Sequence, residues 1–506
     1  MAEAGRQGEE TFVGFALPDI GVLPRHALII GGELADGGGA SHSHVYPANG
    51  EITSSFQLAS AADLDSAVRA ARAAFPAWRA LTGDKRRDLM FRLAAAIEQN
   101  AAALALLGTI EKGEPAMMAQ YLPAVAAQNF RYFGGWADKI QGQTVSTWGG
   151  AAHDYVAYEP YGIIGAIIPW NGPLYAACMV LAPALAAGNC VVLKAPDIAP
   201  YAVMRLGELF GEAGFPAGVV NLVTGGADVG EAIVAHAGVD KIQFVGSGTT
   251  ARKVLRRAAE TLKPCGLELG GKSAVIVFAD ADLREAGRRG LSGGISANGQ
   301  GCVNGTRLLV ERPIYEQYLG MMKVSAAHVP VGDPAARETV LGPVISEAAV
   351  ARILGMVEQA VREGGRLVAG GERLYGDYAG GYFLPLTIIA DVANDSDIAQ
   401  HEVFGPVLTV TPFDTEDDAI ALANGTEYGL GAYIHTQNLR RAHAVAALLD
   451  AGMIQVNGSG EGMTPCAPFG GMKQSGYGRL GGEAGLKEFL RIKNVWMNLA
   501  KPAGAQ

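Results

Sequence analysis

The chain has 506 residues, of which 49% are hydrophobic, 18% are charged and 69 are glycine. This composition excludes a disordered chain, and glycines without a three-residue repeat exclude collagen. The 40 basic and 50 acidic residues give a net charge of −10, and no basic run is interleaved with aromatic residues. We therefore expect a folded protein of roughly three structural units with no nucleic-acid partner.

Cysteine usage and the first residues indicate a reducing compartment. The five cysteines are odd in number and form no C-x-x-C pair, so neither a disulfide framework nor a zinc site is expected. The nine histidines show no metal-ligand spacing, and we expect no bound metal. The first ten residues lack the basic start and apolar core of a secretory signal. A cytoplasmic protein is the resulting expectation.

The uncharged stretch 160–193 is longer than a membrane span requires. Pro169, Pro173 and the Gly188-Asn189 pair divide it, however, into a strand, a helix and a second strand. Neither strand could cross a bilayer without leaving its backbone unpaired. We therefore predict a buried strand, helix, strand unit at the centre of an α/β protein, and no membrane partner.

The chain begins with turns and short extended runs over residues 28–60, which predict a meander of strands. Asp63 and Thr82 are expected to cap the two helices that follow. From residue 158 onward, strands and helices alternate. Strands are predicted near 162–168, 190–194, 219–223, 241–245 and 274–278, and helices near 174–187, 199–213, 228–237 and 249–263. This alternation indicates parallel strands joined by right-handed crossovers.

A second alternating series starts after residue 300. Its predicted strands lie near 306–310, 386–390, 407–412 and 453–456, and its helices near 346–363, 415–423 and 438–450. Thr415 and Asp418 have capping-box spacing, and Gly452 is predicted to end the last helix. The pattern gives two α/β units with a boundary near residue 270, which no linker marks.

The segment Gly246-Ser-Gly-Thr-Thr-Ala251 is a G-x-G-x-x-A between a predicted strand and a predicted helix. Glycine lets the backbone approach a pyrophosphate, and the helix N-terminus supplies free N–H groups. The same letters also fit an ordinary glycine-rich turn, and the spacing favours neither interpretation. A dinucleotide fingerprint would place an acidic ribose ligand about twenty residues further on, where Glu268 stands.

Asn298-Gly-Gln-Gly-Cys302 is a polar, flexible loop that ends in a cysteine, as a thiol nucleophile requires. Cys178 and Cys190 lie in the apolar unit and Cys265 at a strand entry, so all three are interpreted as small buried side chains. Cys466 lies in a proline-rich loop, and the sequence does not define its exposure.

Two polar residues, Asn171 and Lys194, stand at predicted strand ends, where open α/β sheets bind ligands, and a third, Glu268, lies just before a predicted strand. Asn171, between two prolines, could donate to an oxyanion or simply form a turn. Lys194 could be a ligand or a solvated strand end. Glu268, a lone carboxylate between apolar residues, would more often be a surface or ion-paired residue.

Seven segments together, in order, resemble the aldehyde dehydrogenase superfamily. They are Pro169-Trp-Asn171, Lys194, Phe244-Val-Gly-Ser247, Leu267-Glu-Leu-Gly-Gly271, Gly299-Gln-Gly-Cys302, Glu402-Val-Phe-Gly-Pro406 and Pro468-Phe-Gly-Gly-Met-Lys-Gln-Ser-Gly476. The resemblance runs from about residue 28 to 497. It implies two Rossmann-like open-sheet α/β domains and a small β bridging element. The implied domains are an NAD-binding domain (1–140 and 160–270), a catalytic domain (271–478) and the bridging element (141–159 and 479–506), which would pair subunits into dimers or tetramers.

The resemblance also implies roles for individual residues. Cys302 matches the nucleophile, Asn171 an oxyanion donor, and Glu268 the general base rather than a ribose ligand. The implied cofactor-binding residues are Ile168, Pro169, Trp170, Lys194, Asp197, Gly226, Phe244, Gly246, Ser247, Leu269, Glu402 and Phe404. The implied lining of the aldehyde tunnel is Gly172, Tyr175, Met179, Gly301, Val303, Met463 and Cys466.

The implied activity is oxidation of an aldehyde to a carboxylic acid, with NAD as the cofactor and NADP as a possibility. Asp197 stands where the family commonly has Glu, and its charge favours NAD. A proton-release Lys of the family is replaced by Val180, while Glu483 matches its acidic partner. Because no tunnel position is basic, we expect an uncharged, apolar or aromatic aldehyde. The alternatives are a semialdehyde dehydrogenase, a CoA-acylating aldehyde dehydrogenase and, more remotely, a cofactor-independent cysteine esterase.

Overall fold

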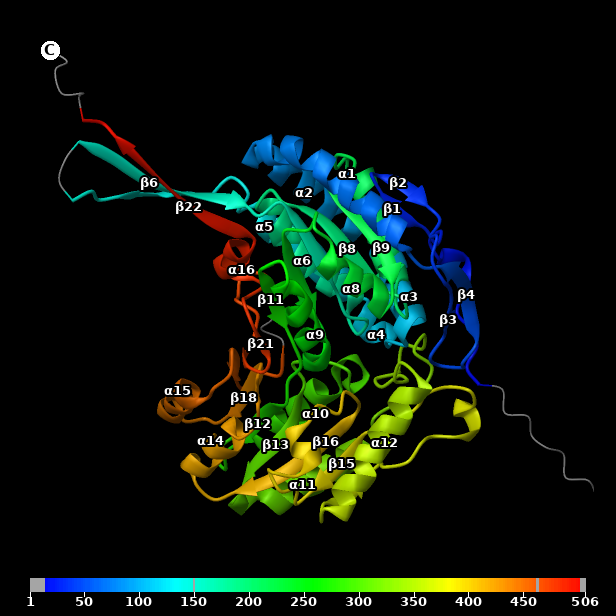
Figure 1. Cartoon of the computed structure of the whole chain (residues 1–506). Coiled ribbons are helices and arrows are strands. Elements are labelled where there is room, and N and C mark those ends of the chain that lie inside the picture. Colours follow the sequence, from blue (N-terminus) through cyan, green and yellow to red (C-terminus); the bar gives the residue numbers. More distant parts are fainter. Residues whose placement is uncertain (1–13, 149–150, 461–463, 501–506) are drawn as a thin grey trace, which may run out of the picture.

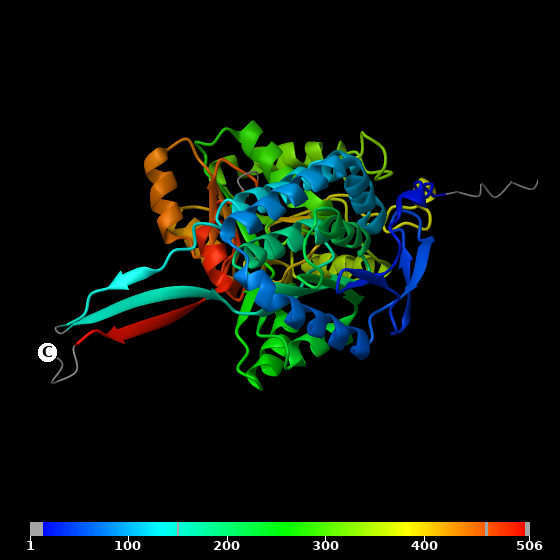
Figure 2. The same cartoon turned by 90° about the horizontal axis from the view of Figure 1, so that it is seen from above.

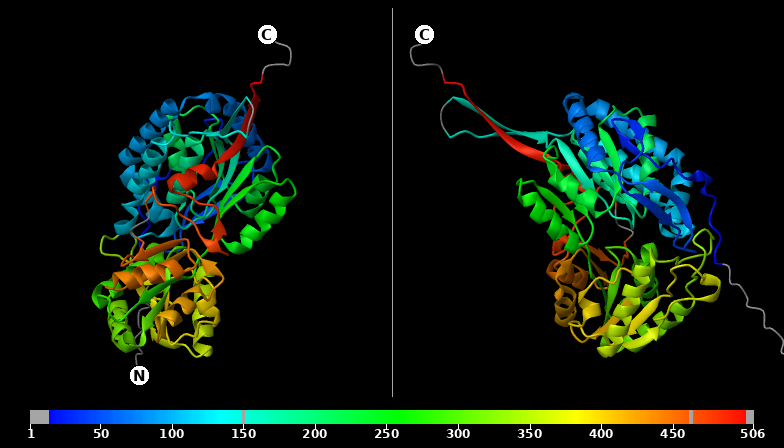
Figure 3. Two further views of the ribbon diagram at one scale, coloured as in Figure 1. Left: turned by 90° about the vertical axis from the view of Figure 1, so that its left-hand side faces the viewer. Right: turned by 45° about the vertical axis from the view of Figure 1, so that its right-hand side comes forward.

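The structure is a computed structural model that describes residues 14–148, 151–460 and 464–500. Two open α/β sheets occupy two lobes, one above the other, and a long β arm projects from the upper lobe (Figure 1). The two lobes stay distinct after rotation (Figure 3), and the view from above shows the arm standing clear of the body (Figure 2). This arrangement confirms the predicted fold class of two Rossmann-like sheets with a small β element.

The upper lobe contains an eight-stranded sheet in the order β2-β1-β9-β8-β7-β10-β11-β21. Its strands are β1 (Leu28–Ile30), β2 (Glu33–Ala35), β7 (Ile163–Ile167), β8 (Cys190–Pro196), β9 (Val220–Gly225), β10 (Lys241–Val245), β11 (Cys265–Glu268) and β21 (Gly476–Tyr477). The five strands from β9 to β11 are parallel, while β1, β2 and β21 pair antiparallel.

Helices cover the upper sheet on both faces. They are α1 (Ala61–Ala80), α2 (Gly83–Gln99), α3 (Ala101–Lys112), α4 (Ala116–Ala119), α5 (Leu122–Gly134), α6 (Pro173–Ala186), α7 (Tyr201–Glu212), α8 (Ala227–Ala235) and α9 (Gly248–Ala259). Every residue of β7 and β8 is buried, as is nearly all of α6. The uncharged stretch is therefore the predicted strand, helix, strand unit, and its apolarity follows from burial on both sides.

The lower lobe contains a seven-stranded sheet in the order β14-β15-β16-β13-β12-β18-β19, in which only β14 is antiparallel. Its strands are β12 (Ser273–Val277), β13 (Gly305–Glu311), β14 (Arg366–Ala369), β15 (Thr387–Ala390), β16 (Val407–Phe413), β18 (Gly431–His435) and β19 (Met453–Val456). Its helices are α10 (Leu283–Ile295), α11 (Tyr315–Ala327), α12 (Glu347–Arg362), α13 (Asp397–Gln400), α14 (Glu416–Asn424) and α15 (Leu439–Leu448).

The arm is an antiparallel sheet of β5 (Gln143–Val145), β6 (Ala152–Pro160) and β22 (Leu490–Asn498), with α16 (Gly482–Glu488) at its base. Two-stranded sheets are formed by β3 (Ser41–Val45) with β4 (Ile52–Gln57) and by β17 (Tyr428–Gly429) with β20 (Met472–Lys473). The predicted domain boundaries stay a prediction.

Several predicted details are wrong. Ser60, not Asp63, is the N-cap of α1, and Asp63 is the third residue of its capping box. Thr82 is the N-cap of α2 as predicted, although its side chain makes no cap hydrogen bond. The helix α15 ends at Leu448, before Gly452, which instead lies against the Gly470 carbonyl. The expected meander is split, because β1 and β2 join the large sheet while β3 and β4 pair alone.

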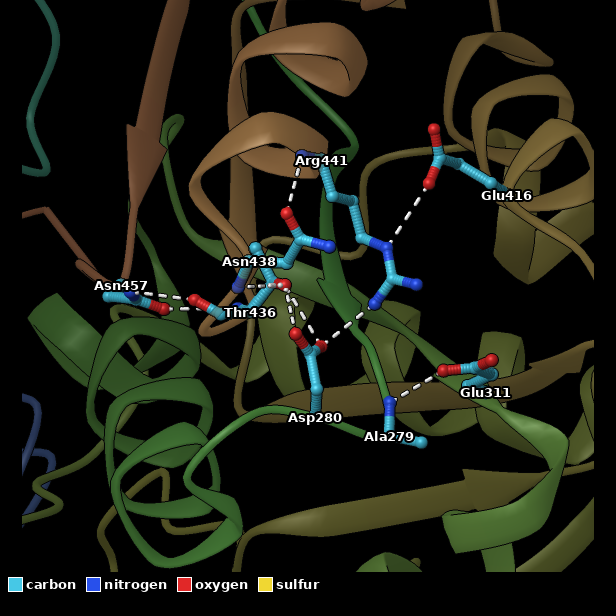
Figure 4. A network of polar contacts seen from close by, with 8 residues as sticks. All are labelled: Ala279, Asp280, Glu311, Glu416, Thr436, Asn438, Arg441 and Asn457. Atoms are coloured by element: carbon cyan, nitrogen blue, oxygen red, sulfur yellow. Dashed lines mark hydrogen bonds and ion pairs between the residues drawn. The ribbon is translucent and has the colours of Figure 1, made fainter.

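A network of polar contacts lies at the carboxyl ends of the lower sheet (Figure 4). Asp280, just beyond β12, accepts hydrogen bonds from the Thr436 hydroxyl (2.8 and 2.9 Å) and from Arg441 (2.9 Å). Arg441 also donates to Glu416 at 3.1 Å. Side chains of α14, α15 and the segments after β12 and β18 are therefore hydrogen-bonded to one another at the edge where open α/β sheets usually bind ligands.

Among the described residues, no single helix is long and apolar enough to cross a membrane. The bent pair α2 and α3, inclined at 69°, meets the length and composition criteria only when the two helices are counted together. Within the same described ranges, no group of three or more His, Cys, Asp or Glu side chains could hold a metal ion.

Candidate active site

The predicted site residues meet where the two lobes face each other. From the upper sheet, Asn171 follows β7, Lys194 lies near the end of β8, and Glu268 is the last residue of β11. From the lower sheet, Cys302 precedes β13 and Glu402 precedes β16. The candidate site is thus bounded by the carboxyl ends of one parallel sheet and the amino ends of the other.

The candidate nucleophile Cys302 lies in the short loop between α10 and β13, and it is partly buried. Its backbone carbonyl lies beside Gly271, where an added Cβ would stand 2.6 Å away. Burial, together with the charges of Glu402 and Glu268, raises the pKa of the Cys302 thiol to about 12. The backbone N–H groups of Cys302 and Val303 oppose this rise. With no nucleotide bound, the thiol is therefore protonated at neutral pH.

Asn171 is joined directly to the cysteine loop. Its side-chain amide donates to the Gln300 carbonyl at 2.8 Å, across 129 residues of sequence. The amide nitrogen carries a second N–H, which can be offered to an oxygen of a bound substrate. The predicted oxyanion donor and the predicted nucleophile therefore belong to one hydrogen-bonded unit.

Glu268 is 2% exposed, and neither of its carboxylate oxygens has a hydrogen-bond partner among the described residues. Burial raises the pKa of this carboxyl well above its usual range. The positive charge of Arg479 opposes the rise, and the negative charge of Glu488 adds to it. Gly470 lies against it, because an added Cβ would stand 2.8 Å from Oε1. A buried carboxyl that is free to accept a proton is a typical general base.

Glu402 and Phe404 approach from the lower lobe. The backbone N–H of Gly271 donates to Glu402 Oε1 at 3.3 Å, and burial raises the pKa of this carboxyl to about 7. Phe404 has a left-handed backbone (φ 50°), and its ring meets Trp170 edge to face with centroids 5.5 Å apart. The two aromatic rings connect the loop after β7 with the segment before β16.

Acidic side chains surround the end of β8. Lys194 is 8% exposed, and burial lowers the pKa of its amine, while the charges of Asp197 and Asp228 oppose that shift. At Gly226 an added Cβ would stand 3.5 Å from Asp197 Oδ2 and 3.2 Å from Asp228 Oδ1. Two carboxylates thus converge beside a buried lysine, and Asp228 was not identified from the sequence. Its position in the first turn of α8, after the end of β9, is the signal that could have found it.

The glycine-rich turn after β10 is the N-terminus of α9. Ser247 is the N-cap and accepts from the Thr250 backbone N–H at 3.3 Å. Gly246 lies directly over the Phe244 ring. At Gly248, by contrast, the nearest atom to an added Cβ would be 3.9 Å away. Free N–H groups at the start of a 12-residue helix, with open space beside them, suit a pyrophosphate. Leu269 and Ile168 are buried nearby, and Pro169 is half-buried.

The predicted tunnel residues are only partly brought together. Tyr175 lies near Cys302 and Cys178, since burial and both thiols raise its pKa to about 12. Gly172 has no atom within 4 Å of an added Cβ, and Met179 is buried in α6. Gly301 and Val303 flank the nucleophile. Cys466 is exposed beside Thr464, and Met463 lies outside the described residues.

The sequence argues against a proton-release relay of the family type, because Val180 replaces its lysine. Glu483 is exposed on α16 and pairs with Lys487 at 2.7 Å, so it is not beside Glu268. Val180 is fully buried in α6. The charged neighbour of Glu268 is instead Arg479, whose guanidinium donates to the Gly471 and Gly478 carbonyls at 2.8 and 2.6 Å. Sequence reasoning missed Arg479 because its role depends on the fold of the glycine-rich loop.

The sequence of this chain is similar to those of known proteins. Residues 35–495 match the model of the Aldehyde dehydrogenase family. An aldehyde dehydrogenase of Alternaria alternata is 42% identical over 466 residues, which cover 91% of this chain and 93% of that protein.

Solved structures give the same picture. The NAD+ complex of an aldehyde dehydrogenase from Bacillus cereus superposes with a TM-score of 0.92 at 37% identity, covering 97% of this chain and 100% of that one. An NADP-dependent enzyme from E. coli superposes with a TM-score of 0.92 at 34% identity, covering 96% and 100%.

Proposed function

Because this chain belongs to the aldehyde dehydrogenase family, and is an oxidoreductase that acts on aldehydes, we propose that it oxidises an uncharged aldehyde to its carboxylic acid with NAD. The observation that carries the proposal is the convergence of three groups. Cys302 lies in the loop that Asn171 binds, and the charge of the buried Glu268 acts on its thiol. These groups are a nucleophile, an oxyanion donor and a base.

Cys302 loses its thiol proton to solvent and adds to the aldehyde carbonyl as a thiolate; the C–S bond forms as the C=O π bond breaks, which leaves a tetrahedral thiohemiacetal oxyanion. The free N–H of the Asn171 amide and the backbone N–H of Cys302 donate to this oxyanion. Because the Asn171 amide is already fixed to the Gln300 carbonyl at 2.8 Å, little reorganisation is needed when the charge develops.

When bound, the nicotinamide would supply the hydride acceptor and a positive charge. Cys302 would hold the acyl group as a thioester once the hydride has left. Glu268 then accepts a proton from a water molecule, whose oxygen attacks the thioester and releases the acid and the thiol. The raised pKa of Glu268 makes this carboxylate a stronger base than an ordinary surface carboxylate.

The residues of the upper sheet fit a dinucleotide. The N-terminus of α9 at Ser247 would hold the pyrophosphate, and Lys194 with Asp197 would hold the adenosine ribose hydroxyls. Glu402 would hold the nicotinamide ribose, with Phe404 and Trp170 beside the ring. Asp197 and Asp228 together would repel a 2′-phosphate, which supports a preference for NAD over NADP.

The substrate class follows from the described tunnel residues. Gly172, Tyr175, Met179, Gly301 and Val303 include no cationic side chain. An anionic semialdehyde would need a positive partner, whereas an apolar or aromatic aldehyde needs only an apolar surface. We therefore favour the uncharged substrate. The exposed Cys466 supports neither class.

The test is an aldehyde panel with NAD and NADP in parallel, followed by absorbance of the reduced nicotinamide. We expect saturable activity with benzaldehyde and medium-chain aldehydes, and a higher kcat/KM with NAD. Activity confined to succinic semialdehyde would refute the proposed substrate class. Acyl-CoA formation on addition of CoA would show an acylating enzyme, and ester hydrolysis without nucleotide would show an esterase.

The arm supports self-association. Ile492, Trp496 and Met497 on β22 are 67%, 56% and 40% exposed, and the arm stands away from the body (Figure 2). Exposed apolar side chains on an open sheet edge are typical of an interface. We propose that the arm pairs two copies of this chain, as a dimer or as half of a tetramer.

A further inference from the structure

The loop that carries Cys302 has an unusual backbone. Ala297, Asn298 and Gly299 are all left-handed, with φ of 51°, 57° and 75°. For residues that have a Cβ this conformation is unfavourable, and it persists only where surrounding contacts hold it. The strained turn lies three to five residues before the candidate nucleophile.

The Asn298 side chain supplies contacts of that kind. It is 2% exposed, and its amide nitrogen donates to the Gly113 carbonyl and to the Pro343 carbonyl, each at 2.9 Å. Its amide oxygen accepts from the Gly342 backbone N–H at 2.8 Å. Three of the four hydrogen bonds that this group can form are therefore made to backbone atoms.

The partners of Asn298 come from both lobes. Gly113 ends α3, whose apolar side chains belong to the hydrophobic core of the upper sheet. Gly342 and Pro343 lie before α12 in the lower lobe. The same amide therefore fixes the loop of Cys302 to both lobes at once.

The neighbours of Asn298 contact the rest of the site. Gly299 lies against the Gly405–Pro406 peptide, where an added Cβ would stand 2.2 to 2.4 Å away. Gln300 accepts at its side chain from the Ile345 N–H (3.0 Å) and at its carbonyl from Asn171 (2.8 Å). A displacement of the turn would therefore move the nucleophile and the oxyanion donor together.

We propose that Asn298 is a positioning residue, whose amide holds the left-handed turn at 297–299 against both lobes and thereby sets the place of Cys302 relative to Asn171. Its three side-chain hydrogen bonds all join backbone atoms of the protein. The inference rests on the proposed function, since it assumes that Cys302 is the nucleophile.

The test compares two matched substitutions. Asn298→Asp keeps the shape and the acceptor but replaces both donated bonds with repulsion between oxygens. Asn189 offers a control, because it is also fully buried, donates to the Ala184 and Phe489 carbonyls at 3.1 and 2.9 Å, and accepts from the Gly162 N–H at 3.0 Å. Asn189→Asp therefore removes an equivalent pair of donated hydrogen bonds at a place outside the cysteine loop.

We expect both variants to lose thermal stability, but only Asn298→Asp to lose turnover. Its kcat for aldehyde oxidation should fall by about a hundredfold, as a small displacement of a reacting group does. The KM values for aldehyde and nucleotide should stay near those of the wild type. The pH profile of Cys302 alkylation by iodoacetamide, followed on the labelled peptide by mass spectrometry, should shift for this variant alone.

Two outcomes would overturn the proposal. One is a folded Asn298→Asp variant with unchanged kcat and alkylation profile, and the other is an equal loss of kcat in both variants. Ala297→Gly relieves the backbone strain at residue 297 without changing the Asn298 amide, so it should keep the wild-type kcat. A loss of kcat in this variant would show that loop stiffness, and not the Asn298 amide, controls turnover. If Asn298→Asp does not fold, Asn298→Ser replaces it in the test. Serine keeps one donor, so kcat should fall by less than a hundredfold, and an unchanged kcat would overturn the proposal.

The alkylation profile needs neither nucleotide nor substrate. If the wild type failed to oxidise any aldehyde, the proposed function would be wrong, while the shift in Cys302 reactivity would still decide the role of Asn298.

Discussion

The substitution Glu268→Gln separates the two halves of the proposed reaction. Glutamine has the volume of glutamate, so the buried site keeps its packing while the proton acceptor is lost. Because neither oxygen of Glu268 has a partner among the described residues, no hydrogen bond is broken by the change. The variant should therefore stay folded, and its loss of turnover should reflect catalysis.

The expected size follows from the role of the carboxylate. Removal of a positioned general base lowers a rate by about 10² to 10⁴, which corresponds to about 2.7 to 5.4 kcal/mol at 1.36 kcal/mol per factor of ten. This loss falls on hydrolysis of the thioester, because formation of the thioester does not need the water molecule. Acylation of Cys302 should stay fast and deacylation should become rate-limiting.

The assay is stopped-flow absorbance of the reduced nicotinamide, followed by steady-state turnover. Glu268→Gln should give a burst of about one nucleotide reduced per active subunit and then a slow steady state. The matched control is Glu483→Gln, the same change at a carboxylate that is 55% exposed and paired only with Lys487. Its turnover should stay within about twofold of the wild type, as is usual for surface changes.

Two results would refute this reasoning. A normal steady-state rate in Glu268→Gln would show that Glu268 is not the base for hydrolysis. Loss of the burst together with turnover, in a variant that melts no lower than the wild type, would show that Glu268 acts before the thioester forms.

Further predictions follow from the same charges and surfaces. Because burial holds the pKa of Cys302 at about 12, alkylation by iodoacetamide without nucleotide should keep rising above pH 9, and NAD should accelerate it at pH 7; an inflection near pH 8.5 without NAD would contradict this. Asp197→Ser should raise kcat/KM for NADP relative to NAD by about tenfold, and an unchanged ratio would exclude a role in cofactor choice. The raised pKa of Glu268 stabilises the fold below pH 4.5, and this contribution is lost as pH rises toward the folded-state pKa. In calorimetry, the melting temperature of Glu268→Gln should therefore increase relative to that of the wild type from pH 5 to 8. An opposite trend would place the Glu268 charge in a solvated site. Trp496→Glu should shift the protein to smaller species in light scattering, and an unchanged mass would show that the arm is not the interface.

Much of the fold could be predicted from local pattern. The uncharged stretch between Pro160 and Leu193 predicts a buried strand, helix and strand because burial on both faces removes polar side chains. The helix α14 and its capping box at Thr415 also follow from spacing alone. The strand β18 was not predicted, and β11 only through the strand entry at Cys265, since short apolar runs carry too little periodicity to identify.

The sequence alone determined the family, the fold class and the identities of the thiol, the amide and the carboxylate, because these depend on residue type and order. Tertiary structure decided their relations. The bond from Asn171 to Gln300 spans 129 residues, and the pKa of Glu268 depends on burial between loops distant in sequence. Asn298 shows the same limit, because a buried asparagine acquires its role only from the backbone atoms that folding places around it.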